Sequence, residues 1–121
     1  MSRRPRRAAW RFGLDAEAMA AWRLRLKGYR ILARRFRCPQ GEIDLVARRG
    51  RTLAFVEVKA RARDAGAELI TSRQRRRIER AATVFLQRHP ALAALELRFD
   101  AVRVEGAGHF HHLPGAWRAG D

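Results

Sequence analysis

Two spacings of apolar residues along the chain predict its helices and strands. Alternating apolar and polar residues predict strands over residues 29–37, 42–48, 52–60 and 95–105, and a short fifth strand over 109–113. Helical spacing predicts helices over residues 16–27 and 72–88; Asp15 caps the first, Thr71 or Ser72 caps the second, and Gly28 and Pro90 mark their ends. Three successive strands, a connecting helix and further strands predict an α/β fold in the order α-β-β-β-α-β-β. The predicted architecture is a mixed β-sheet flanked by helices.

The length of 121 residues fits one compact domain. We expect a basic flexible arm over residues 1–12, a single domain over 13–117 and a loose tail over 118–121. No stretch approaches the roughly 18 apolar residues that would span a bilayer, so we expect no membrane contact and a cytoplasmic location. The single cysteine, Cys38, excludes an internal disulfide.

The charge of the chain points to a polyanionic partner. Lysine and arginine total 27 against 12 acidic residues, a net charge of +15. We expect DNA contacts of the backbone type, which depend on salt and carry no sequence specificity. A merely solvated basic face is the alternative. The candidate phosphate contacts are Arg73, Arg75, Arg76, Arg77 and Arg80 on the second helix, with Arg3, Arg4, Arg6 and Arg7 in the arm.

The segment "TLAFVEVKA" places two charged residues on a strand face that is otherwise apolar. Side chains alternate in a strand, so Glu57 and Lys59 share the face of Leu53 and Phe55. A face that is at least half buried is a poor place for charges without partners. Glu57 and Lys59 are therefore candidates for a functional site, against the alternative of an ordinary strand with a salt-bridged edge.

The hairpin before this strand decides whether Asp44 joins them. A two-residue loop at Arg49-Gly50, the simplest choice, sets Asp44 opposite Phe55, whereas a loop at residues 50–51 sets it opposite Glu57. Both registers bring the carboxylates within about 5–8 Å at Cβ. A loop of odd length would turn Asp44 to the other face.

Two partly buried carboxylates repel each other unless a cation lies between them. Oxygen ligands suit Mg²⁺ or Mn²⁺, held by one or two carboxylates together with water and substrate phosphate. Such an ion and the ammonium of Lys59 would orient a water at a phosphodiester. Lys59 is one of only two lysines in the chain. Its compact point charge suits that role better than the wide fork of arginine.

The motifs "GEIDL" and "FVEVK", with "EAMAAWRLRLKGYRILARRFRCPQ" before them and "ITSRQRRRIERAATVFL" and "LRFDAVRV" after them, closely resemble the YraN family of small bacterial proteins. The resemblance runs from about Gly13 to Trp117. The family is similar to the PD-(D/E)xK nuclease superfamily, which includes Holliday-junction resolvases and restriction endonucleases. The resemblance implies a restriction-endonuclease-like sheet and a metal-dependent nuclease.

Carried over by position, the resemblance makes Asp44, Glu57 and the carbonyl of Val58 the metal ligands, and Lys59 the lysine of the motif. It places Glu17 near the metal-bound waters, whereas the helical pattern alone leaves Glu17 as an acidic residue beside a packed stripe. The family commonly has glycine where this chain has Ala16, and lysine where it has Gln74. Gln74 is expected to face the sheet and could donate to a phosphate or a water, without charge.

These observations lead to one hypothesis and two alternatives. The hypothesis is a Mg²⁺- or Mn²⁺-dependent DNA endonuclease, acting on branched or damaged DNA and able to form a homodimer, since relatives of the resolvase type act as dimers. The alternatives are a non-catalytic nucleic-acid-binding protein and an interaction subunit of a DNA-processing complex.

Two further features carry separate expectations. Asp100 lies within an apolar strand, where it either supports the site or holds a buried donor. His109, His111 and His112 are expected to be strand residues rather than metal ligands.

Overall fold

The computed structural model describes residues 16–61, 70–105 and 108–121 and confirms the predicted order of elements. A helix over residues 16–26 precedes all the other elements. The arm over residues 1–12, the cap Asp15 and most of the loop before the second helix lie outside the described residues. The remaining elements are β1 (Arg30–Cys38), β2 (Gly41–Arg49), β3 (Thr52–Arg61), α2 (Ser72–Arg88), the short 3₁₀ helix η1 (Pro90–Ala94), β4 (Glu96–Glu105) and β5 (His109–Trp117).

The five strands form one mixed sheet in the order β1-β2-β3-β4-β5. Strands β1, β2 and β3 are antiparallel neighbours, β3 and β4 are parallel, and β4 and β5 are antiparallel. The parallel pair requires a crossover, which α2 and η1 supply. The sequence did not predict η1, and β5 extends to Trp117, four residues beyond the short strand that was expected.

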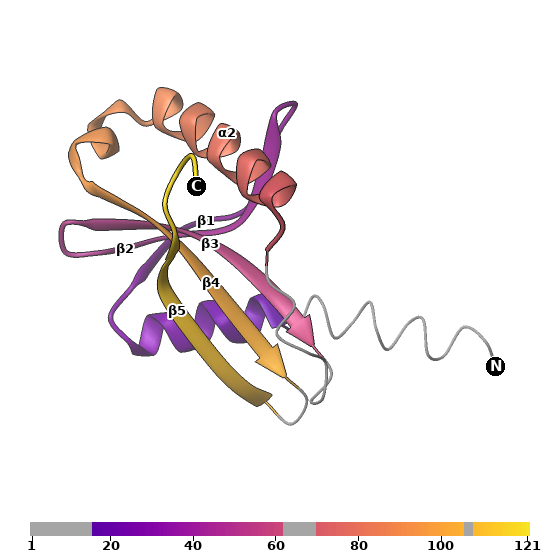
Figure 1. Ribbon diagram of the computed structural model, residues 1–121. Helices are drawn as coiled ribbons and strands as arrows, with labels where there is room; N and C mark the ends of the chain where they lie inside the picture. Colours follow the sequence, from indigo (N-terminus) through magenta and orange to yellow (C-terminus); the bar gives the residue numbers. More distant parts are fainter. Residues whose placement is uncertain (1–15, 62–69, 106–107) are drawn as a thin grey trace.

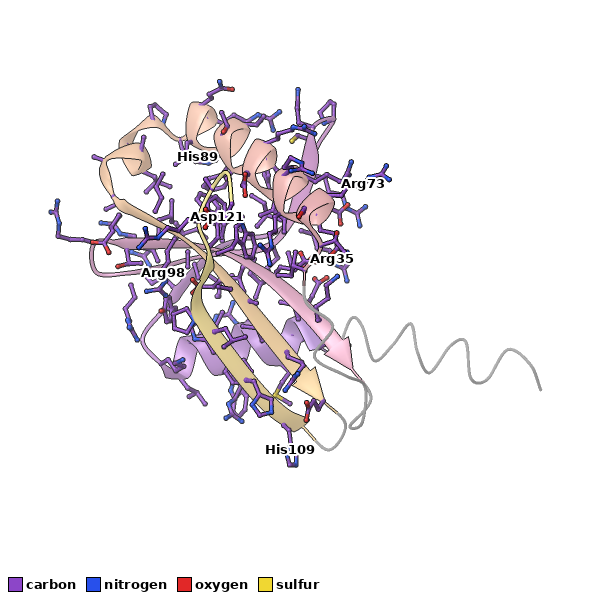
Figure 2. All side chains as sticks on the ribbon, in the orientation of Figure 1. Arg35, Arg73, His89, Arg98, His109 and Asp121 are labelled. Atoms are coloured by element: carbon purple, nitrogen blue, oxygen red, sulfur yellow. The ribbon has the colours of Figure 1, made fainter. Side chains whose placement is uncertain are left out.

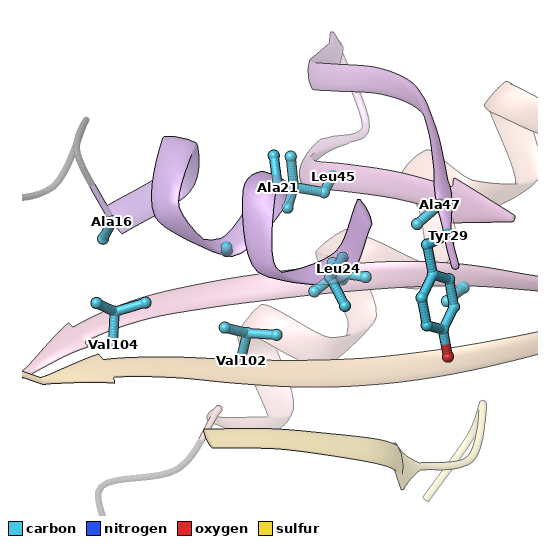
Figure 3. Close-up of a cluster of buried hydrophobic side chains, with 11 residues drawn as sticks. Ala16, Ala21, Leu24, Tyr29, Leu45, Ala47, Val102 and Val104 are labelled. Carbon is cyan, nitrogen blue, oxygen red and sulfur yellow. The ribbon is translucent and has the colours of Figure 1, made fainter. Parts of the chain in front are cut away.

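A helix covers each face of the sheet (Figure 1). The helix over residues 16–26 buries Ala20 and Leu24 against one face, in a cluster that includes Leu45, Val56 and Val102 (Figure 3). Its end follows the predicted glycine signal, because Gly28 has a φ of 95° and the Tyr29 N–H donates to the Leu24 carbonyl at 3.0 Å.

Helix α2 packs on the opposite face, mainly over β2. Its buried stripe contains Ile78, Ala81, Ala82 and Phe85, at the spacing that the sequence predicted. This stripe contacts Phe55 and its neighbours in a second cluster of buried apolar residues. Each face of the sheet therefore has its own core. None of the described helices is long and apolar enough to cross a membrane.

The β2–β3 hairpin has the second of the two even registers. Arg49 pairs with Thr52, so the turn residues are Gly50 and Arg51. The simplest expectation, a turn at Arg49-Gly50 with Asp44 opposite Phe55, is wrong. Gly50 has a φ of 61°, and a glycine with positive φ at the first turn position is what a type II′ hairpin requires.

Gly41, the first residue of β2, lies against the backbone of α2. A Cβ built on Gly41 would stand 2.1 Å from the carbonyl oxygen of Arg77, and no side-chain rotation can relieve a clash with backbone. Gly41→Ala is expected to lower the free energy of unfolding by about 1–3 kcal/mol, the usual cost of overpacking. Urea unfolding measures this loss. Gly50→Ala isolates strain at a positive φ, because nothing lies within 4 Å of its Cβ, whereas Gly41 has no positive φ; wild-type stability of Gly41→Ala would contradict the packing argument.

Candidate functional site

Asp44 lies where the backbone pairing of β2 and β3 ends. The last pair in this direction is Leu45 with Val56. Beyond this pair, the N–H of Val58 donates to Asp44 Oδ2 at 2.8 Å. The main chain of β3 thus holds the Asp44 carboxylate beside Glu57 and Val58, two of the residues that the family resemblance names as ligands.

The surroundings of Asp44 disfavour its negative charge. Burial is the largest cause that raises its pKa, from 3.8 to about 8, and the charge of Glu57 is the next. The Val58 N–H opposes this shift, whereas a hydrogen bond with Glu57 and the charge of Glu17 add to it. The protein therefore brings three carboxyl groups close enough to interact, and a cation beside them would relieve their repulsion.

Lys59 lies beside Glu57 on β3. Its Nζ is 3.2 Å from Glu57 Oε2, and the two side chains are 24% and 15% exposed. Leu53 and Phe55 belong to the cluster under α2, whereas Ala54 and Val56 belong to the cluster on the other face, so the predicted alternation along β3 is confirmed. The site consequently has an ammonium at its edge and carboxylates inside it.

Glu17 reaches the site from the helix over residues 16–26. Its Oε1 accepts a hydrogen bond from Arg35 Nε at 2.9 Å. Arg35 has a φ of 53°, a left-handed conformation that is rare outside glycine, and the alternation of β1 shifts there: Ala33 and Phe36, three residues apart, both pack on the cluster under α2. This irregularity in β1 places an arginine beside Glu17, which the sequence did not predict.

Gln74 makes two hydrogen bonds that cap the start of α2. Its Oε1 accepts from the Thr71 N–H at 3.0 Å, and the Gln74 N–H donates to Thr71 Oγ1 at 3.1 Å. The two residues form a capping box, and Thr71 is the N-cap that the sequence offered as one of two choices. The side-chain carbonyl of Gln74 is thereby used to begin the helix, which the sequence analysis missed although T-x-x-Q is a capping-box signal.

The exposed side of α2 is strongly basic. Arg73, at the start of the helix, projects into solvent with its neighbours (Figure 2), and Arg76, Arg77 and Arg80 are also exposed. Arg75 is different. It is half-buried, its Nε donates to the Ile70 carbonyl at 3.0 Å, and its guanidinium lies 5.8 Å from the ring centre of Trp117. The basic arginines of the arm, residues 3, 4, 6 and 7, lie outside the described residues.

Across residues 16–61, 70–105 and 108–121, no group of three or more His, Cys, Asp or Glu side chains is arranged to hold a metal ion. A magnesium-type site needs only one or two carboxylates, with water and substrate oxygens filling the remaining positions. Asp44, Glu57 and the Val58 carbonyl provide such a donor set. The three histidines lie on β5, as expected of strand residues.

Asp100 is fully buried on β4 and holds several donors. Arg98 donates to both of its oxygens at 2.8 Å, His112 lies 2.8 Å from Oδ2, and the Gly115 N–H donates to Oδ1 at 2.9 Å. Because a carboxylate only accepts, His112 carries its proton on Nε2. Of the two roles left open by the sequence, holding a buried donor is the one that the structure shows.

Lys27, the other lysine of the chain, belongs to this same network. Its Nζ contacts Nδ1 of His112, whose ring is almost fully buried. Burial is the largest cause that lowers the pKa of Lys27, and the charge of Arg49 is the next. The two lysines thus lie beside two different carboxylate groups, and the sequence did not predict the second group because its members are up to 85 residues apart.

Fold and site together define a class of protein: a small basic α/β domain with a carboxylate pair and a lysine on neighbouring strands. The chain belongs to the uncharacterised protein family UPF0102, the YraN family, whose family model matches residues 16–104. The predicted family is thus confirmed, whereas the similarity to nucleases stays a prediction.

Several proteins named UPF0102 protein are similar over most of the chain. The protein from Parvibaculum lavamentivorans is 57% identical over 112 residues, 92% of this chain and 84% of the relative. The protein from Rhodopseudomonas palustris strain BisB18 is 58% identical over 113 residues, 93% and 84% of the two chains. The protein from Methylorubrum extorquens is 56% identical over 113 residues, 93% and 88% of the two chains.

Proposed function

We propose that this protein is a Mg²⁺- or Mn²⁺-dependent DNA endonuclease that acts in the cytoplasm on branched or damaged DNA. One observation carries the proposal: the Val58 N–H holds the Asp44 carboxylate at 2.8 Å, close enough to interact with Glu57, whose Oε2 lies 3.2 Å from Lys59 Nζ. Carboxylates are rarely set side by side on a half-buried surface without a cation to bind.

Each residue of the site has a separate task in this proposal. Asp44 and Glu57, with the Val58 carbonyl, would hold the ion, and the Val58 N–H fixes the Asp44 carboxylate. The ion would act as a Lewis acid on the phosphodiester and lower the pKa of a water. Lys59 would orient the attacking water and stabilise negative charge on the phosphate oxygens. Glu17, held by Arg35, would accept hydrogen bonds from nearby waters.

The basic side of α2 would bind the DNA backbone. Arg73, Arg76, Arg77 and Arg80 are exposed on one helix, and the net charge of +15 attracts polyanions. Contacts to phosphates position the duplex without reading its sequence. A homodimer would place two such sites on the two strands of a junction.

Cleavage of labelled plasmid and branched DNA tests the proposal directly. The purified protein is incubated with Mn²⁺, with Mg²⁺ and with EDTA, beside an identically prepared Glu57→Ala variant. Cutting that requires the metal and is lost in the variant supports a nuclease. Equal cutting by the two preparations would assign the activity to a contaminant.

A second candidate function is a DNA-binding protein that retains the nuclease fold without catalysis. The observation that favours it is the capping box of α2, which uses the side-chain carbonyl of Gln74 at a position where the family commonly has lysine. DNA binding without cutting, unchanged in Asp44→Ala, would support this candidate. Absence of DNA binding would favour an interaction subunit.

Metal binding can be measured apart from catalysis. A ligand that binds only the folded state raises the free energy of unfolding by about 2.7 kcal/mol at 100 times its Kd. Mn²⁺ is expected to raise the melting temperature of the wild-type protein by several degrees over EDTA, and to have no such effect on Asp44→Asn. Glu42→Gln is the matched control, because Glu42 lies on the same strand with its side chain 54% exposed. An equal Mn²⁺ effect in all three proteins would contradict the assigned ligands.

A further inference from the structure

A cavity of about 520 Å³ lies beside Lys59, between β4, the end of β5 and the residues before α2. Its volume is within the roughly 300–1,000 Å³ typical of small-molecule sites. The larger groove of the molecule, about 940 Å³ between α2 and β4, is lined by Arg76 and Arg80 but by neither Lys59 nor the candidate metal ligands. The cavity beside Lys59 is therefore the one that continues from the proposed active site.

The lining of this cavity combines cations with apolar surface. Lys59 and Arg103 are directly paired across the parallel strands β3 and β4, and Arg75 lies on the side of α2. Lys59 and Arg103 each have a carboxylate of their own strand beside them, Glu57 and Glu105. Leu113, which is 51% exposed, and Trp117 contribute apolar walls. This combination suits a ligand with an anionic group and a flat apolar part.

Arg103 is paired with a carboxylate of its own strand, that of Glu105. Its Nε lies 3.0 Å from Glu105 Oε2, and the same carboxylate lies 3.7 Å from His111 Nε2. That Nε is buried and makes no hydrogen bond in the part of the chain that the structure describes. The contact with Glu105 therefore orients the guanidinium, and the side chain, which is 34% exposed, keeps its other N–H groups as possible donors to a ligand.

A bulge in β5 forms one wall of the cavity. The β4–β5 register shifts between Phe99 and Ala101, and the extra residues of β5 include Gly115, with a φ of 62°. The Gly115 N–H donates to the buried carboxylate of Asp100 at 2.9 Å. Bulges are common beside active sites, where they redirect the backbone. The Asp100 network thus fixes the shape of this wall.

We propose that this cavity binds an unstacked nucleotide of the DNA strand, its base against Leu113 and its phosphate between Arg75 and Arg103. The inference rests on the proposed function, because Lys59 is shared by the cavity and the site. It identifies the preferred substrate as DNA with an unpaired nucleotide beside the cleaved bond. Extruding a base costs least where it is already unpaired.

Fluorescence anisotropy with three labelled duplexes tests this proposal in Ca²⁺, with strand integrity checked on gels. One duplex is fully paired, one carries a single unpaired nucleotide, and the third has an abasic residue at that position. The wild-type protein is expected to bind the unpaired nucleotide about tenfold more tightly than the paired duplex. The abasic residue should remove most of that preference.

Two cavity variants and one control complete the experiment. Leu113→Ser removes an exposed apolar wall and Arg103→Gln removes a cation; each should reduce the preference to within about twofold. Arg30→Gln makes the same change of charge on an exposed residue of β1, and should leave the preference unchanged. The inference would be overturned if the wild-type protein bound the paired and unpaired duplexes equally, or bound the abasic duplex as tightly as the duplex with the unpaired nucleotide. It would also be overturned if both cavity variants kept the wild-type preference.

The outcomes separate this inference from the proposed nuclease activity. Cutting of DNA without any preference for the unpaired nucleotide would overturn the cavity assignment and leave the nuclease in place. A preference that depends on Leu113 and Arg103, in a protein that cuts nothing, would support the cavity and contradict catalysis. No binding to any of the three duplexes would overturn both.

Discussion

Glu57→Ala is expected to reduce metal-dependent DNA cleavage by about 10³-fold or more. Glu57 interacts with Asp44 and lies 3.2 Å from Lys59, so its removal takes away a proposed metal ligand and the ion-pair partner of the lysine. A metal contributes several kcal/mol of transition-state stabilisation, and each 1.36 kcal/mol corresponds to a factor of ten in rate. Single-turnover cleavage of a labelled branched duplex in Mn²⁺ measures the loss.

The controls for this prediction separate chemistry from binding and folding. Glu42→Ala removes an exposed carboxylate from the neighbouring strand and should keep full activity. In EDTA, Glu57→Ala should bind DNA at least as tightly as the wild type, because without a metal the substitution only removes a negative charge near the phosphate. A variant that folds, binds and cuts at the wild-type rate would exclude Glu57 from the site.

Local patterns predicted the elements that carry the site. Alternation along β3 placed Glu57 and Lys59 on one face because side chains in a strand alternate strictly, and the structure has the same two faces. The position of Asp44 depended on the hairpin register. The expected turn was off by one residue, yet the Val58 N–H holds the Asp44 carboxylate where it interacts with Glu57, so the two carboxyl groups still meet.

The remaining features depend on contacts that no local pattern records. Arg35 adopts a positive φ and meets Glu17, 18 residues earlier, although nothing near Arg35 in the sequence resembles a turn. The bulge of β5 depends on Asp100, 15 residues before Gly115. Gln74 differs, because its capping box corresponds to a local T-x-x-Q signal in the sequence.

The hydrogen bonds around Asp100 connect the two faces of the sheet. The residues of this network come from the segment after the first helix, from β4 and from β5, since Arg98 also donates to the Tyr29 hydroxyl at 2.6 Å. Through Arg98 the network reaches Tyr29, which belongs to the cluster under the helix over residues 16–26, whereas Gly115 lines the cavity beside Lys59. One buried carboxylate therefore joins the core on one face of the sheet to the proposed ligand site on the other.

Asp100→Asn is expected to lower the free energy of unfolding by about 3–5 kcal/mol, the usual cost of removing one partner from a buried ion pair. The asparagine keeps the shape of the side chain but removes the charge that Arg98 pairs with, and its amide group would present a donor to other donors. Guanidinium chloride unfolding at pH 7 measures the loss. Glu96→Gln, at an exposed position of the same strand, should change stability by less than about 0.5 kcal/mol.

The same variant has a defined dependence on pH. Burial alone would raise the pKa of Asp100, but hydrogen bonds from His112, Arg98 and Gly115 outweigh it and lower the pKa from 3.8 to about 2. A carboxyl group with a lowered pKa in the folded state stabilises fully above its unfolded pKa, and this stabilisation is lost as the pH falls from about 4 to about 2. The stability difference between wild type and Asp100→Asn should therefore be constant from pH 7 to 5 and shrink below pH 4. A difference that stays constant down to pH 3 would contradict the charged network.

If Asp100 also shapes the cavity wall, Asp100→Asn should lose the preference for an unpaired nucleotide at pH 7, under conditions where it remains folded.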